Sequence, residues 1–91
     1  MKTRAHLFID GRVQRVFFRG FTREVAVSLG LKGWVRNLYD GRVEAVFEGE
    51  KDKILEAIGH CYQGPPFAVV TKIDTNWEEA LEGFEDFTVR R

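Results

Sequence analysis

The chain has 91 residues, of which 44% are hydrophobic and eight are Phe; this is enough for one domain with a packed core and too apolar for intrinsic disorder. A single cysteine, Cys61, excludes an internal disulfide framework and a cysteine-based zinc site. The sequence has no signal-peptide core and no run near the roughly 20 apolar residues of a membrane helix. We therefore expect a cytoplasmic protein that has no contact with membranes.

The formal net charge is zero, which argues against a nucleic-acid partner, because nucleic-acid-binding domains usually carry a basic excess. The charges are unevenly distributed along the chain. Residues 1–43 hold nine Lys and Arg against three Asp and Glu, a net charge of +6, and residues 44–91 hold five against eleven, a net charge of −6. The positive first half predicts attraction of a small anionic ligand.

The first thirty residues predict a strand, a loop and a helix. Over residues 5–13 side chains alternate with a period of two, which is typical of a strand with one buried face. From Phe18 to Leu29 the apolar residues fall at helical spacing, and Gly30 stands where a left-handed C-cap would end the helix.

The loop between this strand and helix predicts an anion site. Backbone N–H groups at a helix start are free and the helix dipole is positive there. Four arginines crowd the same place, namely Arg12, Arg15, Arg19 and Arg23. Residues 11–20 therefore predict an oxyanion site, and phosphate is the ligand expected.

Residues 31–49 predict an antiparallel hairpin that turns at Asp40-Gly41, because glycine supplies the positive φ of tight turns. The second arm alternates between residues expected in the core and residues expected in water, namely Val43, Ala45 and Phe47 against Arg42, Glu44 and Glu48.

From Glu50 the pattern is helical again, and Pro65-Pro66 ends the helix. Its expected apolar stripe consists of Ile54, Leu55, Ile58, Cys61 and Tyr62. Residues 67–77 predict a strand, residues 78–83 an acidic loop, and residues 84–91 a short last strand with Phe87 and Val89 on one face.

Five other side chains are expected to have no catalytic role. Trp34 and Trp77 are expected in the core or half-buried on strands, and Cys61 is expected to be an inert packed thiol. His6 and His60 are isolated in the sequence and are expected at the surface.

The element order is β-α-β-β-α-β with a short terminal strand. This order predicts an α+β fold, the ferredoxin-like βαββαβ sandwich, in which two helices cover one face of an antiparallel sheet. No linker or repeat interrupts residues 1–91, so we expect a single domain over that range.

Two stretches of this sequence closely resemble the acylphosphatase family. The first is Gly11-Arg12-Val13-Gln14-x-Val16-x-Phe18-Arg19, and the second begins at Gly33-Trp34-Val35-Arg36-Asn37 and continues through Asp40-Gly41-x-Val43-Glu44. The resemblance covers nearly the whole chain, and the two stretches occur in the family's order.

The resemblance implies a hydrolase that splits the carboxyl–phosphate bond of acyl phosphates without a metal ion or other cofactor. Family catalytic residues map onto Arg19, which would bind phosphate, and Asn37, which would orient the attacking water. A substrate cradle would be formed by the backbone of Gln14, Arg15, Val16, Phe17 and Phe18. The resemblance also suggests a monomer. The expected partners are a small-molecule acyl phosphate and inorganic phosphate.

Two alternatives remain open at the level of sequence. Arg15 stands where the family normally has glycine, so the chain is alternatively an anion-binding module with an altered cradle and impaired catalysis. The second alternative is an RNA-binding domain, because Arg19-Gly20-Phe21 resembles the start of an RNA-binding strand motif. Helical spacing of the residues that follow argues against that alternative.

Overall fold

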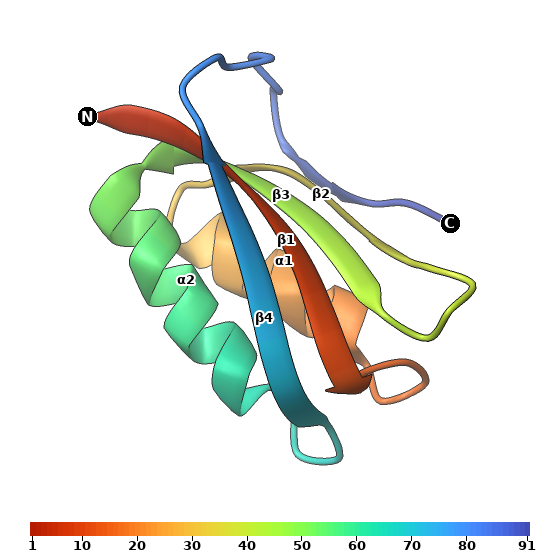
Figure 1. The fold of residues 1–91 in the computed structure, drawn as a ribbon. Helices are drawn as coiled ribbons and strands as arrows, with labels where there is room; N and C mark the ends of the chain where they lie inside the picture. Colours follow the sequence, from red (N-terminus) through yellow and green to blue (C-terminus); the bar gives the residue numbers. More distant parts are fainter.

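The computed structural model describes residues 1–91 as a five-stranded sheet with two helices packed on one face (Figure 1). The elements in chain order are β1 (Lys2–Arg12), α1 (Phe18–Ser28), β2 (Lys32–Asn37), β3 (Val43–Glu50), α2 (Lys51–Gln63), β4 (Val69–Glu78) and β5 (Phe87–Val89). The strand order is β4-β1-β3-β2-β5. The predicted ferredoxin-like α+β architecture is confirmed.

All neighbouring strands are antiparallel except β5, which pairs parallel with β2. The parallel pair brings the end of the chain beside β2, on the far side of the sheet from β4 (Figure 1). The backbone N–H of Arg90 donates to the carbonyl of Val35 just beyond β5. Sequence patterning predicted this short strand but not its partner.

The core lies between the sheet and the helices, and β1 is one of the inner strands of that sheet. Ala5, Leu7 and Ile9 are fully buried, as the alternation predicted, because β1 pairs on both sides and faces the helices. At Asp10-Gly11 the register with β4 shifts. Gly11 has φ of 126° there, and a Cβ would lie 2.0 Å from the Val69 carbonyl oxygen, so only glycine fits.

The helix α2 buries a narrower stripe than predicted. Ile54, Ala57 and Cys61 point into the core, whereas Leu55 and Tyr62 are about half exposed. The prediction that Leu55 and Tyr62 belong to the buried stripe was wrong, because the sheet covers only the side of the helix centred on Ile54, Ala57 and Cys61. Neither helix is long and apolar enough to cross a membrane.

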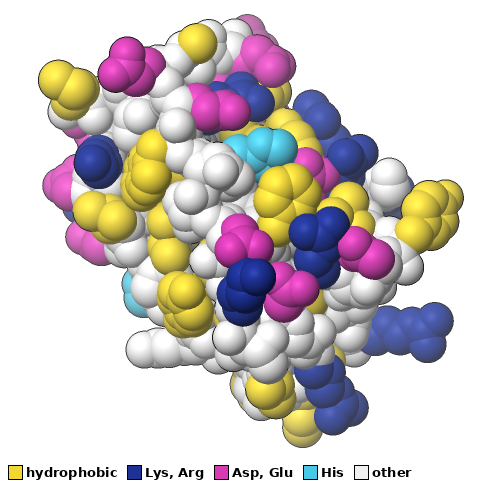
Figure 2. Space-filling view, viewed as in Figure 1, with side chains coloured by type: hydrophobic (Ala, Val, Ile, Leu, Met, Phe, Trp, Pro, Cys, Tyr) yellow, Lys and Arg dark blue, Asp and Glu magenta, His cyan; other side chains and the backbone are white.

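The other face of the sheet carries charged side chains of both signs among hydrophobic ones (Figure 2). Glu44 and Glu48 were predicted in water, but both are buried, with 6% and 5% of their surface exposed. Basic side chains lie over them. Glu44 contacts His6 Nε2 at 2.6 Å and accepts from Arg36 Nε at 2.6 Å. The prediction of an isolated surface His6 was therefore wrong.

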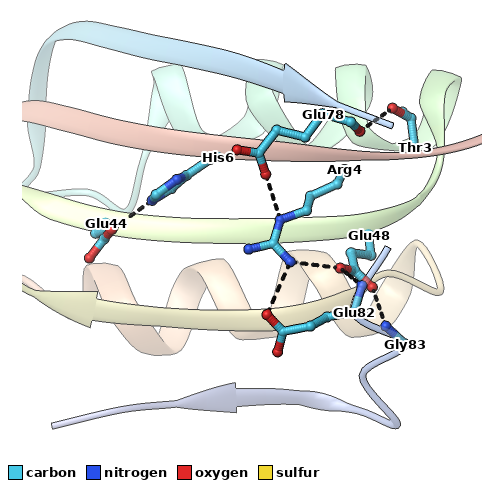
Figure 3. A network of polar contacts seen from close by, with 8 residues as sticks. All are labelled: Thr3, Arg4, His6, Glu44, Glu48, Glu78, Glu82 and Gly83. Atoms are coloured by element: carbon cyan, nitrogen blue, oxygen red, sulfur yellow. Dashed lines mark hydrogen bonds and ion pairs between the residues drawn. The ribbon is translucent and has the colours of Figure 1, made fainter. Parts of the chain in front are cut away.

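Glu48 is the centre of a polar network on this face (Figure 3). It accepts hydrogen bonds from Arg4 Nη1 at 3.0 Å and from the backbone N–H groups of Glu82 and Gly83 at 2.8 and 3.0 Å. Burial by itself would raise the pKa of the Glu48 carboxyl, but the two backbone bonds and Arg4 outweigh burial and hold that pKa below its ordinary value. The network fastens the loop between β4 and β5 to the sheet.

Both tryptophans lie on strands and are buried or half-buried, as predicted. Trp34 on β2 is 8% exposed because the guanidinium groups of Arg36 and Arg90 lie over its ring, at 5.3 and 4.4 Å from the centroid. Trp77 on β4 is half-exposed, with Lys51 Nζ 5.2 Å from the centroid of its ring.

Candidate active site

The loop between β1 and α1 has a backbone shape suited to holding an anion. Arg15 and Phe17 have φ of 63° and 65°, whereas Gln14, Val16 and Phe18 do not have positive φ. Such alternation turns successive backbone N–H groups toward a common side, which makes a concave anion-binding surface. We call residues 14–18 the cradle.

The first turn of α1 leaves its N–H groups available. Phe17 is the N-cap residue in left-handed geometry, no side chain caps the helix, and no acidic residue lies in the first turn. The positive end of the helix dipole therefore faces the cradle uncompensated. The ring of Phe17 lies against Gly20, where an added Cβ would come within 2.3 Å of Phe17 Cε1.

A cavity of about 210 Å³ opens beside the cradle. Arg19 reaches it from α1, and Asn37 reaches it from the end of β2. The other lining residues are Val13, Arg15, Phe17, Phe18, Gly20, Val89 and Arg91. Of the residues predicted from the sequence, the fold brings Arg15, Phe17, Phe18, Arg19 and Asn37 to one cavity.

The side-chain oxygen of Asn37, Oδ1, is buried and has no hydrogen-bond partner in the protein. A buried polar atom without a partner costs about 1–3 kcal/mol. Because Asn37 lines the cavity, a water or ligand bound there is the candidate partner for its side chain.

The side chain of Gln14 has a structural task. Its Nε2 donates to the carbonyls of Leu38 and Arg42, at 2.7 and 3.0 Å, and so ties the cradle to the β2–β3 turn that follows Asn37. Neither Gln14 nor Val16 lines the cavity, so these two predicted residues can contribute through their backbone only.

The turn itself is braced by Asp40. Its carboxylate accepts from Arg42 Nε at 2.9 Å and from the Arg42 backbone N–H at 3.1 Å. The hydrogen bonds from Arg42 hold the pKa of Asp40 below its ordinary value. The predicted turn at Asp40-Gly41 is confirmed, and Gly41 has φ of 98°.

The guanidinium of Arg19 is free to meet a ligand. Its only protein hydrogen bond runs from Nη1 to the carbonyl of Arg90 at 3.4 Å, which is long. No acidic side chain lies within 4 Å of Arg15, Arg19 or Arg91, and none lines the cavity. The electrostatic character of the cavity is therefore strongly positive.

Two lining residues were not foreseen from the sequence. Val89 and Arg91 come from the end of the chain, and they reach the cavity because β5 runs parallel to β2. Residues 87–91 by themselves carry no signal for that placement.

The remaining titratable groups do not form a second reactive centre. Cys61 is fully buried, which confirms the predicted packed thiol, and burial raises the pKa of that thiol to about 12. No three His, Cys, Asp or Glu side chains gather where they could hold a metal ion.

The family model for acylphosphatase matches residues 5–89. This chain belongs to the acylphosphatase family. An acylphosphatase from Chloroflexus aurantiacus is 55% identical to this one over 86 residues, which are 94% of each chain. The crystal structure of an acylphosphatase from Bacillus subtilis superposes with a TM-score of 0.96 at 36% identity and covers all of both chains. An acylphosphatase structure from Coxiella burnetii gives 0.92 at 42% identity and covers 98% of this chain and 93% of that one.

The activity of this acylphosphatase is the hydrolysis of acyl phosphates, as the family and these relatives support. The reading as a non-catalytic anion-binding module is not favoured. The sequence Arg19-Gly20-Phe21, which resembled an RNA-binding strand motif, lies on α1 and not on a strand.

Proposed function

We propose that this acylphosphatase hydrolyses small acyl phosphates in the cavity beside the cradle, with Arg19 binding the phosphoryl group and Asn37 orienting the attacking water. The observation that carries the proposal is that one cavity is lined by Arg19, whose guanidinium has no acidic partner, and by Asn37, whose buried Oδ1 has no hydrogen-bond partner in the protein. The amide oxygen of Asn37 can accept a hydrogen bond from a water molecule. That bond fixes the orientation of the water and hence the direction of the water's lone pairs.

The cradle and Arg19 suit a phosphoryl group. Phosphoryl transfer spreads negative charge over the peripheral oxygens, so catalysis consists mainly of positioning and electrostatic stabilisation. A guanidinium offers a planar fork of donors that meets two oxygens at once and stays charged at every working pH. The free N–H groups of residues 14–18 and the start of α1 add donors that need no reorganisation.

The reaction needs no strong base from the protein. The water oxygen forms a bond to phosphorus, the bond from phosphorus to the acyl oxygen breaks, and the acyl group leaves as a carboxylate with the electron pair. Asn37 orients the water but cannot take its proton. Because no Asp, Glu or His side chain lines the cavity, we assign that proton to a phosphoryl oxygen.

Benzoyl phosphate hydrolysis tests the two roles. We expect Arg19→Ala to lower kcat/KM by about 10²–10³ or more, as for loss of a donor that stabilises the transition state. Asn37→Ala should lower kcat more than it raises KM, because it removes the partner of the water and not that of the phosphoryl group. Arg23→Ala, one helical turn beyond Arg19 and outside the cavity, is the control. Wild-type rates in Arg19→Ala would refute the assignment.

We further propose that residues 1–91 work as one monomeric domain in the cytoplasm, without a nucleic-acid partner. The single hydrophobic core supports one domain. The lone, buried Cys61, which forms no disulfide, fits the reducing cytoplasm. Analytical ultracentrifugation tests the monomer.

A further inference from the structure

Arg15 brings more positive charge to the cavity than the proposed chemistry uses. A phosphoryl group carries about two negative charges near neutral pH. Arg19 supplies one positive charge, and the start of α1 supplies about half a charge together with its free N–H groups. Arg15 and Arg91 line the same cavity and have no acidic partner. With both of them the positive charge exceeds that of the phosphoryl group by more than one unit, so the charge of Arg15 is available for a different anionic group.

Glycine would adopt the backbone conformation of Arg15 at a lower conformational energy. An L-residue at φ of 63° costs about 1–2 kcal/mol, and glycine holds this conformation without that cost. The other strained residue, Phe17, packs its ring against Gly20, whereas the side chain of Arg15 forms no ion pair and lies over no aromatic ring. A strained residue at a binding cavity indicates that its side chain acts on the ligand.

We propose that Arg15 selects acyl phosphates whose acyl group carries a carboxylate. This inference rests on the proposed function of the cavity, because it places the phosphoryl group at Arg19 and gives the acyl group the remaining lining. One unpaired guanidinium balances one carboxylate, and the planar fork of Arg matches the two carboxylate oxygens. The substrate class is therefore the acyl phosphates of dicarboxylic acids, in which one carboxyl group forms the mixed anhydride with phosphate and the other is a free carboxylate.

The test compares substrates that differ by one carboxylate. Benzoyl phosphate is measured against 3- and 4-carboxybenzoyl phosphate, which are rigid and place the second anion at two different distances. The readout is the ratio of kcat/KM for each carboxylated substrate to kcat/KM for benzoyl phosphate. A ratio taken within one preparation is independent of the fraction of protein that is folded.

Arg15→Asn removes the charge and keeps a residue type that tolerates positive φ. We expect it to lower the ratio about tenfold for at least one carboxylated substrate, equivalent to about 1.4 kcal/mol. Arg15→Lys should keep most of the preference, and 0.5 M salt should weaken the preference in the wild type. Arg23→Gln removes an equal charge outside the cavity and should leave the ratio unchanged.

Two results would overturn the inference. One is a ratio in Arg15→Asn within twofold of the wild-type ratio for both carboxylated substrates; the other is an equal fall in Arg23→Gln, which would indicate a general field effect. Either result leaves the proposed function intact as long as benzoyl phosphate is hydrolysed with dependence on Arg19. Failure of the wild type to hydrolyse any of the three substrates would instead refute the proposed function.

Discussion

Glu48 offers the sharpest test of how the polar network on the open face of the sheet stabilises the fold. The carboxylate is 5% exposed and accepts three hydrogen bonds, one from Arg4 and two from the loop backbone (Figure 3). Glu48→Gln keeps the shape and one acceptor oxygen but removes the charge. It also turns an amide NH₂ group toward donors that need an acceptor.

Breaking a buried ion pair from one side costs about 3–5 kcal/mol. Arg4 retains Glu78 at 2.7 Å and Glu82 at 3.5 Å, so it is not left unpaired, and the loss should lie at the lower end, about 3 kcal/mol. For a domain of this size, 1 kcal/mol shifts Tm by about 4–8 °C. We therefore expect Glu48→Gln to lower Tm by about 12–24 °C.

Urea unfolding followed by tryptophan fluorescence measures the free energy of unfolding, and Glu85→Gln is the control. Glu85 is exposed on the same loop and forms no ion pair or hydrogen bond through its side chain, so its change should stay within about 0.5 kcal/mol. A loss below about 1 kcal/mol in Glu48→Gln would contradict the reasoning. Limited proteolysis at residues 79–86 should become faster in Glu48→Gln, because the loop loses its anchor.

Three further predictions follow from the contacts described above. The carboxyls of Glu44 and Glu48 have lowered pKa values in the folded protein. Their stabilisation is therefore complete above the unfolded pKa of about 4.3 and is lost as pH falls through the folded values. Unfolding at graded pH should show this fall, and the two Glu→Gln variants should flatten it. Gln14→Ala removes both bonds to the β2–β3 turn. It should cost about 1–2 kcal/mol by urea unfolding and lower kcat more than it raises KM, because Asn37 loses its support. Cys61 should not react with a thiol reagent at pH 8 until the protein is unfolded, since the thiol is buried with a pKa of about 12; rapid labelling of the native protein would refute its burial.

Local patterns determined the secondary structure. The alternation on β1, the helical spacing from Phe18, and the turn at Asp40-Gly41 each depend on residues close together in the sequence. These local predictions agree with the structure because the apolar faces that they define are the faces that pack in the core. The two stretches resembling the family also predicted that Arg19 and Asn37 belong to one site, and both line the same cavity.

Burial on the open face of the sheet could not be read from the alternation. Glu44 and Glu48 lie on the outward face, as the period of two requires, but they are covered by basic side chains from neighbouring strands. His6 meets Glu44 only because β1 pairs with β3 in that register. Cross-strand contacts of this kind depend on which strands become neighbours.

The cavity beside the cradle likewise depends in part on local sequence and in part on tertiary structure. The sequence by itself determined that an arginine-rich loop precedes a helix and that a hairpin follows. Tertiary structure alone decided that Val89 and Arg91 complete the cavity, because the parallel pairing of β5 with β2 joins residues far apart in the chain. It also decided the positive φ of Arg15, because the conformation of a loop residue depends on the strand end and helix start that it must connect.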